Sequence, residues 1–133
     1  MDDLRQHLQD ALLALLAGDG EPFRDMWSAN DDVAIMGAWG GVDQGWAELG
    51  PRLDWASGRF SGGGTVVLDP VASWMGEDLA VLVDLERKTG ERDGRTMDSV
   101  IRCTHVFRRE SGEWRLVLRH ADDSVEATSH WRD

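Results

Sequence analysis

His105 is the residue of this 133-residue chain that is best placed for acid–base chemistry. It lies in a strand-like stretch where Ile101, Cys103, His105 and Phe107 alternate with more polar residues and therefore share one face. That face is the more apolar one, and we place it against the core. An imidazole titrates near neutral pH and could act there as a general acid or base. The alternative is a buried neutral imidazole bonded to a backbone carbonyl.

Two carboxylates on a neighbouring predicted strand could assist this histidine. Asp84 and Glu86 share one face of the segment from Leu79 to Lys88. Paired carboxylates can divide into acid and base roles when their environments differ. The sequence favours a plainer interpretation, in which both belong to an exposed face and pair with arginines of an adjacent strand.

Asp122 is a third candidate partner for His105. It shares a face with His120, two residues earlier, and this pair could bind a metal if a third ligand lay nearby. No further His or Cys has a convincing spacing, so we expect no metal site. The single cysteine, Cys103, excludes an intrachain disulfide and fits a reducing cytoplasm.

Other residues could hold a ligand without reacting with it. The candidates are Trp39, Trp46, Trp55, Cys103, Phe107 and Arg119. Arg119 could hold an anionic group as a planar fork, or it could be a surface arginine that covers the sheet. The three tryptophans could line a cavity, although aromatic residues at helical spacing are more often plain core.

The elements that must position these residues follow an α-then-β order. The pattern predicts helices over residues 4–16, from Pro22 onward and over 44–57, and strands over 33–36, 65–75, 79–88, 96–109 and 114–121. Asp43 would cap the third helix, which Pro51 should kink or break. Pro70 indicates an edge strand or a bulge. The glycine-rich segments 37–41 and 58–64 are predicted to be irregular, and 90–94 to be an exposed loop.

Composition limits the possible partners. The chain has 25 acidic and 14 basic residues, a net charge of −11. This charge repels phosphate and anionic lipid, so nucleic acids and membrane surfaces are not expected partners. No segment approaches the roughly 18 consecutive apolar residues of a membrane span. We expect one cytoplasmic domain over residues 1–133, with a polar tail at 124–133.

The stretch from Arg102 to Asp122 carries a family resemblance. It has a Thr-x-Val-aromatic-Arg-Arg strand, an acidic-Gly turn and a Trp-led strand that ends in His. This hairpin resembles the last hairpin of SnoaL-like proteins, a branch of the nuclear transport factor 2-like superfamily. The resemblance implies an α+β fold in which a cone-shaped, curved antiparallel sheet wraps on N-terminal helices. It also implies one apolar pocket for a small organic ligand, and we expect no cofactor.

The resemblance suggests two classes of function. Family members include ketosteroid isomerases, polyketide cyclases, scytalone dehydratases and limonene epoxide hydrolases. If the chain is such an enzyme, His105 would be the general acid or base, Asp84 or Asp122 its carboxylate partner, and Arg119 would orient the substrate. The chain has no Tyr, which argues against the ketosteroid isomerase mechanism. The alternative is a non-catalytic dimerisation or ligand-binding module that would use the same sheet for dimerisation and the cavity for a ligand or for nothing. The similar calcium/calmodulin-dependent kinase association domain has a pocket arginine at the position of His105, so the resemblance implies a pocket location for His105 but a different charge.

The last predicted strand has apolar residues on both faces. One face carries Trp114, Leu116 and Leu118, and the other carries Val117 and Ala121. A sheet that is apolar on both sides suggests a partner on its outer face. Relatives of this kind commonly form dimers by packing sheets, so we expect a homodimer whose contact is supplied by Trp114, Leu116 and Leu118.

Overall fold

The computed structural model describes residues 1–124, and in it the helices precede the long strands. The elements are α1 (Asp2–Leu16), α2 (Glu21–Asp25), β1 (Ala34–Gly37), β2 (Gly40–Gln44), α3 (Trp46–Ser57), β3 (Phe60–Met75), β4 (Leu79–Arg92), β5 (Arg95–Glu110) and β6 (Glu113–Asp123). Apart from Ser124, the predicted polar tail at residues 124–133 lies outside the described residues. No helix of the described chain is long and apolar enough to cross a bilayer.

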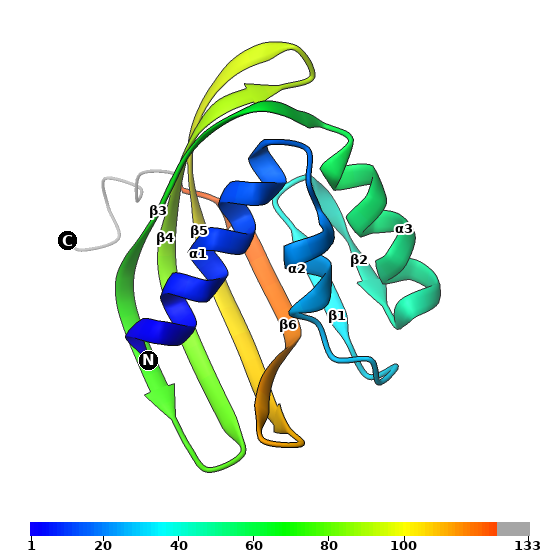
Figure 1. Ribbon diagram of the computed structural model, residues 1–133, viewed down its shortest axis with the longest axis vertical. Helices are drawn as coiled ribbons and strands as arrows, with labels where there is room; N and C mark the ends of the chain where they lie inside the picture. Colours follow the sequence, from blue (N-terminus) through cyan, green and yellow to red (C-terminus); the bar gives the residue numbers. More distant parts are fainter. Residues whose placement is uncertain (125–133) are drawn as a thin grey trace, which may run out of the picture.

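The six strands form one curved, unclosed sheet in the order β2-β1-β6-β5-β4-β3. All neighbours are antiparallel except β1 and β6, which run parallel. Figure 1 shows the three helices on one face of the sheet, with α1 crossing β3, β4 and β5 and α3 beside β2. The predicted α+β class and curved sheet are confirmed, apart from the one parallel pair.

The leucines of α1 explain how the helix packs. They recur at helical spacing, and Leu8, Leu12 and Leu16 are almost fully buried against the sheet. Gly18 follows the helix with a φ of +88°, a conformation that favours glycine. The resulting core lies between α1, α2 and α3 and the inner face of the sheet.

Tight turns fix the register of the long strands. Ser111 and Gly112, with φ of 50° and 81°, join β5 to β6 at the predicted hairpin turn. A similar pair, Asp93 and Gly94, joins β4 to β5, so the predicted exposed loop at 90–94 is mostly strand. β3 is an edge strand with a register shift between Pro70 and Ala72, which confirms the prediction from Pro70.

Two glycine-rich segments are more regular than predicted. Residues 40–44 form β2, so Asp43 belongs to a strand and α3 begins later, at Trp46 after Gly45. Residues 60–64 form the start of β3, where a Cβ on Gly64 would lie 1.9 Å from the carbonyl oxygen of Thr89. Glycine is therefore what lets β3 approach β4 there. The predicted break at Pro51 is wrong, because α3 continues through it as one helix.

A bulge in β6 changes which side chains face the helices. Val106 pairs with Leu118 but Phe107 pairs with Leu116, so the register shifts by one residue at Val117. Leu116 is consequently buried in the core, while Leu118 turns to the outer face. The prediction that Leu116 contacts a second copy is therefore wrong, and the partly buried Trp114 also packs against the core.

Candidate functional site

A cavity of about 240 Å³ lies between the helices and the inner face of the sheet. Its apolar walls include Leu12, Leu15, Phe23, Ile35, Leu53 and Phe60. These residues come from α1, α2, β1, α3 and β3, elements that the fold brings together on one side of the sheet. A mostly apolar cavity with a few polar groups is the usual form of a small-molecule site.

The charged residues of the cavity are mainly basic. Four cations line it, Arg52, Lys88, Arg92 and Arg119, against one carboxylate, Asp123. The chain as a whole carries a net charge of −11, so the basic lining is opposite in sign to the rest of the protein. Arg52 is paired with Asp43, at 2.7 Å between Nε and Oδ2. The cavity is therefore electrostatically suited to an anion.

Arg119 is held by a buried carboxylate beneath the cavity. Its Nη1 and Nη2 donate to Oε1 and Oε2 of Glu86, at 2.9 and 3.0 Å. Burial by itself would raise the pKa of Glu86, but the charges of Arg119 and Lys88 hold that pKa well below its usual value. Burial likewise disfavours the charged guanidinium, yet Glu86 keeps the pKa of Arg119 above its usual value. Both groups are therefore ionised, in a two-pronged ion pair.

Only part of the hydrogen-bonding capacity of Arg119 is used by this pair. A guanidinium has five N–H donors. Nη1 donates to Glu86 and His105, and Nη2 donates to Glu86; the sulfur of Cys103 also lies close enough to help keep the pKa of Arg119 above its usual value. Arg119 also lines the cavity, so part of this side chain borders the space that a ligand would occupy.

His105 lies beside Arg119 but does not line the cavity. Its Nε2 is 2.8 Å from Nη1 of Arg119. Arginine can only donate, so Nε2 is the acceptor and the proton of the neutral ring is on Nδ1. Burial, together with the positive charge of Arg119, lowers the pKa of His105 to about 3. The side chain is fully buried, and Nδ1 has no hydrogen-bond partner in the described chain.

Lys88 and Cys103 complete the surroundings of Glu86. Lys88 Nζ is 2.9 Å from Oε2 of Glu86, and this side chain also lines the cavity. Cys103 donates its thiol to Oε1 of Glu86 at 3.7 Å. Burial raises the pKa of this thiol to about 12, so it remains protonated and unreactive. Cys103 is not among the residues that line the cavity.

Asp84 is buried on the inner face of β4 and belongs to a separate ion pair. Its Oδ1 accepts from Nε of Arg5 at 2.7 Å, while its Oδ2 has no partner among the described residues. Burial raises the pKa of Asp84, and Arg5 offsets only part of this effect. The prediction that Asp84 and Glu86 lie on an exposed face is therefore wrong, because both side chains are fully buried.

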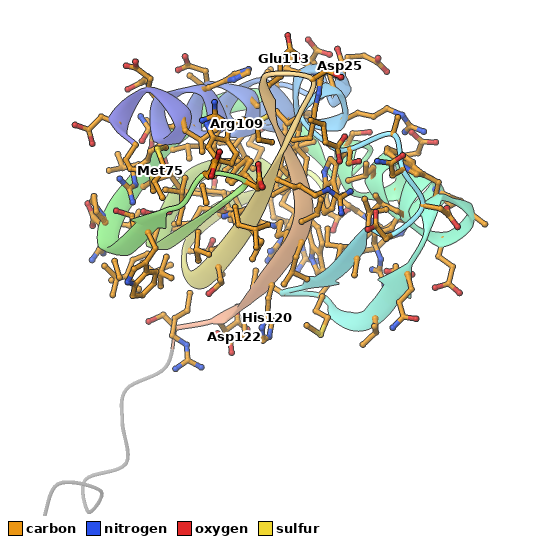
Figure 2. All side chains as sticks on the ribbon, turned by 90° about the horizontal axis from the view of Figure 1, so that it is seen from below. Asp25, Met75, Arg109, Glu113, His120 and Asp122 are labelled. Atoms are coloured by element: carbon orange, nitrogen blue, oxygen red, sulfur yellow. The ribbon has the colours of Figure 1, made fainter. Side chains whose placement is uncertain are left out.

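Asp122 does not lie near His105. It is exposed and accepts two hydrogen bonds from Arg102, at 2.8 and 2.9 Å. Figure 2 shows Asp122 and His120 at the end of β6, on the side of the sheet away from α1. Within residues 1–124 no group of three His, Cys, Asp or Glu side chains could hold a metal.

The three candidate tryptophans occupy different places. Trp39 lines the cavity, and Trp55 packs against it edge to face at 5.0 Å between ring centroids. Trp46 packs on the core and donates its Nε1–H to the carbonyl oxygen of Ser28 at 2.9 Å. Phe107 is fully buried core. Of the predicted ligand contacts, Trp39 and Arg119 thus line the cavity itself.

Sequence reasoning missed the central role of Glu86 and the contribution of Lys88. The signal was the alternation of side chains along the strand. One face of β4 carries Ala80, Leu82, Asp84, Glu86 and Lys88. The two apolar members mark that face as buried, and an acid followed two residues later by a base can be neutralised there.

Three solved structures illustrate which known folds this chain resembles. A candidate dehydratase of the NTF2-like family from Streptomyces avermitilis has a TM-score of 0.78 at 19% identity, covering 94% of each chain. An NTF2-like superfamily protein from Salmonella enterica serovar Typhimurium has a TM-score of 0.76 at 17% identity, covering 98% of this chain and 97% of that one. The association domain of C. elegans CaMKII has a TM-score of 0.70 at 17% identity, covering 91% and 93%.

At these identities the structural likenesses show the fold alone. Comparison with curated proteins gives no significant match. The sequence profile of the SnoaL-like domain, in contrast, matches residues 4–124, nearly the whole chain. The chain therefore belongs to the SnoaL-like family and has the NTF2-like fold.

Proposed function

We propose that this protein binds a small organic molecule with one carboxylate or equivalent anionic group. Arg119 would hold the anion, and the apolar walls would cover the rest of the molecule. The observation that carries this proposal is the position of Arg119, which lines the cavity and is fixed there by two hydrogen bonds to Glu86. A guanidinium held in this way is pre-organised for a carboxylate.

The charge balance beneath the cavity supports a singly charged ligand. Glu86 contacts two cations, Arg119 and Lys88, so this group of three side chains has a net charge of +1. One carboxylate would neutralise it. The low pKa of His105 supports the same assignment, because the neutral ring adds no further positive charge near pH 7.

Acid–base catalysis of an isomerisation, cyclisation or dehydration is a second candidate function. One observation favours it: Asp84 Oδ2 and His105 Nδ1 are a buried acceptor and a buried donor, both without partners in the described chain. They lie on adjacent strands, since Leu82 pairs with His105 and Asp84 with Cys103. Neither side chain lines the cavity, however, and His105 is a weak base with a pKa of about 3, so we rank binding first.

The binding proposal is tested first on the unmodified protein. Native mass spectrometry would reveal a copurified molecule, and calorimetry would compare hexanoate with hexanamide, which share a chain but differ in charge. We expect hexanoate to bind about 10- to 150-fold more tightly, the equivalent of about 1.5–3 kcal/mol for a charge-assisted hydrogen bond. Equal affinity of the two, or binding of neither at millimolar concentration, would contradict the proposal.

Variants at Arg119 give a second test. Arg119→Lys keeps the charge but loses the fork, so we expect most of the preference for the acid to disappear while the ion pair with Glu86 remains. Arg119→Gln would leave Glu86 buried without this partner and could cost about 3–5 kcal/mol of stability. Arg102→Gln, at an exposed arginine of β5, is the matched control and should leave affinity unchanged.

We also propose that the protein is a cytoplasmic homodimer that pairs through the outer face of the sheet. One row across that face is apolar: Trp74 pairs with Val81, Val81 with Val106 and Val106 with Leu118. Trp74 is 62% exposed, and the other three are half-buried. An apolar row of this kind on an uncovered sheet face supports a protein–protein contact. The single, buried thiol of Cys103 supports the reducing compartment.

A further inference from the structure

Trp39 is an unusual lining residue because it is large, apolar and 41% exposed. It lies in the connection between β1 and β2, next to Gly40 and Gly41, whose φ values are +94° and +80°. Trp55 contacts it edge to face, and the ring centroid of Phe60 is 5.7 Å away. The indole is therefore fixed on one side by other rings, while part of its surface is left uncovered at the cavity.

A flat cation lies beside this indole. Cζ of Arg92 is 5.9 Å from the centroid of the Trp39 ring, and both side chains line the cavity. Arg92 has no carboxylate within 4.0 Å among the described residues, so its guanidinium is not held in an ion pair there. Indole and guanidinium are both planar and polarisable, and both stack well on a flat ring.

Aromatic rings also lie next to the cations that would hold the carboxylate. Cζ of Arg119 is 6.0 Å from the centroid of Phe23, and Nζ of Lys88 is 5.6 Å from that of Phe60. Phe23, Trp39 and Phe60 all line the cavity. The space between Arg119 and Trp39 is thus bordered by ring faces and edges as well as by aliphatic side chains.

The size of the cavity limits what these rings can enclose. A cavity of about 150 Å³ lined by apolar side chains is enough to hold one benzene molecule. The present cavity of about 240 Å³ therefore has room for one six-membered ring with a short side chain that carries a carboxylate.

We propose that the ligand is a monocyclic aromatic carboxylate, with its ring against Trp39 and Phe60 and its carboxylate on Arg119. This assignment rests on the proposed anion binding at Arg119 and adds the chemical class of the ligand body. Edge-to-face and offset contacts between rings stabilise aromatic pairs beyond the area that they bury. Trp39 is then the residue that distinguishes an aromatic ligand from an aliphatic one.

The test is calorimetry with three probes of nearly equal size: 3-phenylpropionate, 3-cyclohexylpropionate and 3-phenylpropionamide. The cyclohexyl ring is more hydrophobic than the phenyl ring, so a cavity that selected ligands by buried apolar area alone would prefer the cyclohexyl acid. We expect the phenyl acid to bind about 2- to 10-fold more tightly than the cyclohexyl acid. Trp39→Leu should abolish this difference and keep the preference of acid over amide. Val71→Ala, at an exposed apolar residue of β3 that belongs neither to the cavity lining nor to the apolar row of the outer face, is the control and should change neither.

The outcomes separate the two proposals. If the cyclohexyl acid binds as tightly as the phenyl acid or more tightly, the aromatic assignment is overturned while anion binding stands. If Trp39→Leu retains the full preference for the phenyl ring, Trp39 is not the residue that distinguishes an aromatic from an aliphatic ligand. If the phenyl acid binds no more tightly than its amide, anion binding at Arg119 is overturned, and the aromatic carboxylate assignment fails with it.

Discussion

At the scale of single residues, His105 is better described as a support for Arg119 than as a base. It accepts from Nη1 of Arg119 and is fully buried outside the cavity lining. We expect His105→Leu to leave that N–H unpaired, to cost about 1–3 kcal/mol of stability and to weaken carboxylate binding. His105→Gln supplies another acceptor and should largely restore affinity. Urea unfolding and calorimetry measure both effects, and equal affinity of the Leu variant and the original protein would contradict the role.

The lowered pKa of His105 also gives a signed pH dependence. Burial and Arg119 bring this pKa to about 3, from 6.5 for an unperturbed histidine. As the pH falls below about 6.5, the unfolded chain binds a proton that folded His105 does not, so the free energy of unfolding decreases. We expect the loss of stability between pH 7 and pH 5 to be smaller in His105→Gln than in the original protein. Urea titrations of both at the two pH values check this, and equal losses would show that His105 does not contribute.

At the scale of elements, the alternation of side chains between the two faces of a regular strand was predictable from sequence, but the bulge that interrupts it was not. Alternation along residues 96–109 correctly placed His105 and Phe107 on the buried face. The same rule failed for Leu116, because one extra residue at Val117 reverses the alternation and no residue type marks the bulge. Alternation also put Glu86 on the same face as Ala80 and Leu82, but its burial was not predicted, because a buried carboxylate needs a partner from another strand, here Arg119 of β6. The family resemblance predicted the fold, but the cavity lining required the tertiary arrangement.

The close approach of β3 and β4 at Gly64 gives a prediction for these elements. A Cβ there would lie 1.9 Å from the carbonyl oxygen of Thr89, so the two strands would have to separate. We expect Gly64→Ala to lower the free energy of unfolding by about 1–3 kcal/mol. Gly37→Ala is the control, because a Cβ on Gly37 meets nothing within 4 Å. Denaturant unfolding of both variants measures the difference, and equal stability would contradict the steric argument.

At the scale of the whole molecule, the two faces of the sheet have separate tasks in our proposals. The inner face carries the core and the cavity, and the outer face carries the apolar row that we assign to a second copy. A charged side chain in the middle of that row should oppose pairing, because it would be buried without a partner in the dimer. Val106 is central, since it lies between Val81 and Leu118 on the neighbouring strands.

We therefore expect Val106→Lys to convert a dimer into a monomer while leaving the cavity intact. Val42→Lys, at an exposed residue of the edge strand β2, is the control and should remain dimeric. Native mass spectrometry and light scattering give the mass, and 3-phenylpropionate titration reports on the cavity. A monomeric original protein would contradict the outer-face contact, whereas a dimer that persists in Val106→Lys would place the contact elsewhere on the molecule. Carboxylate binding that survived in the monomer would show that one chain forms the complete site.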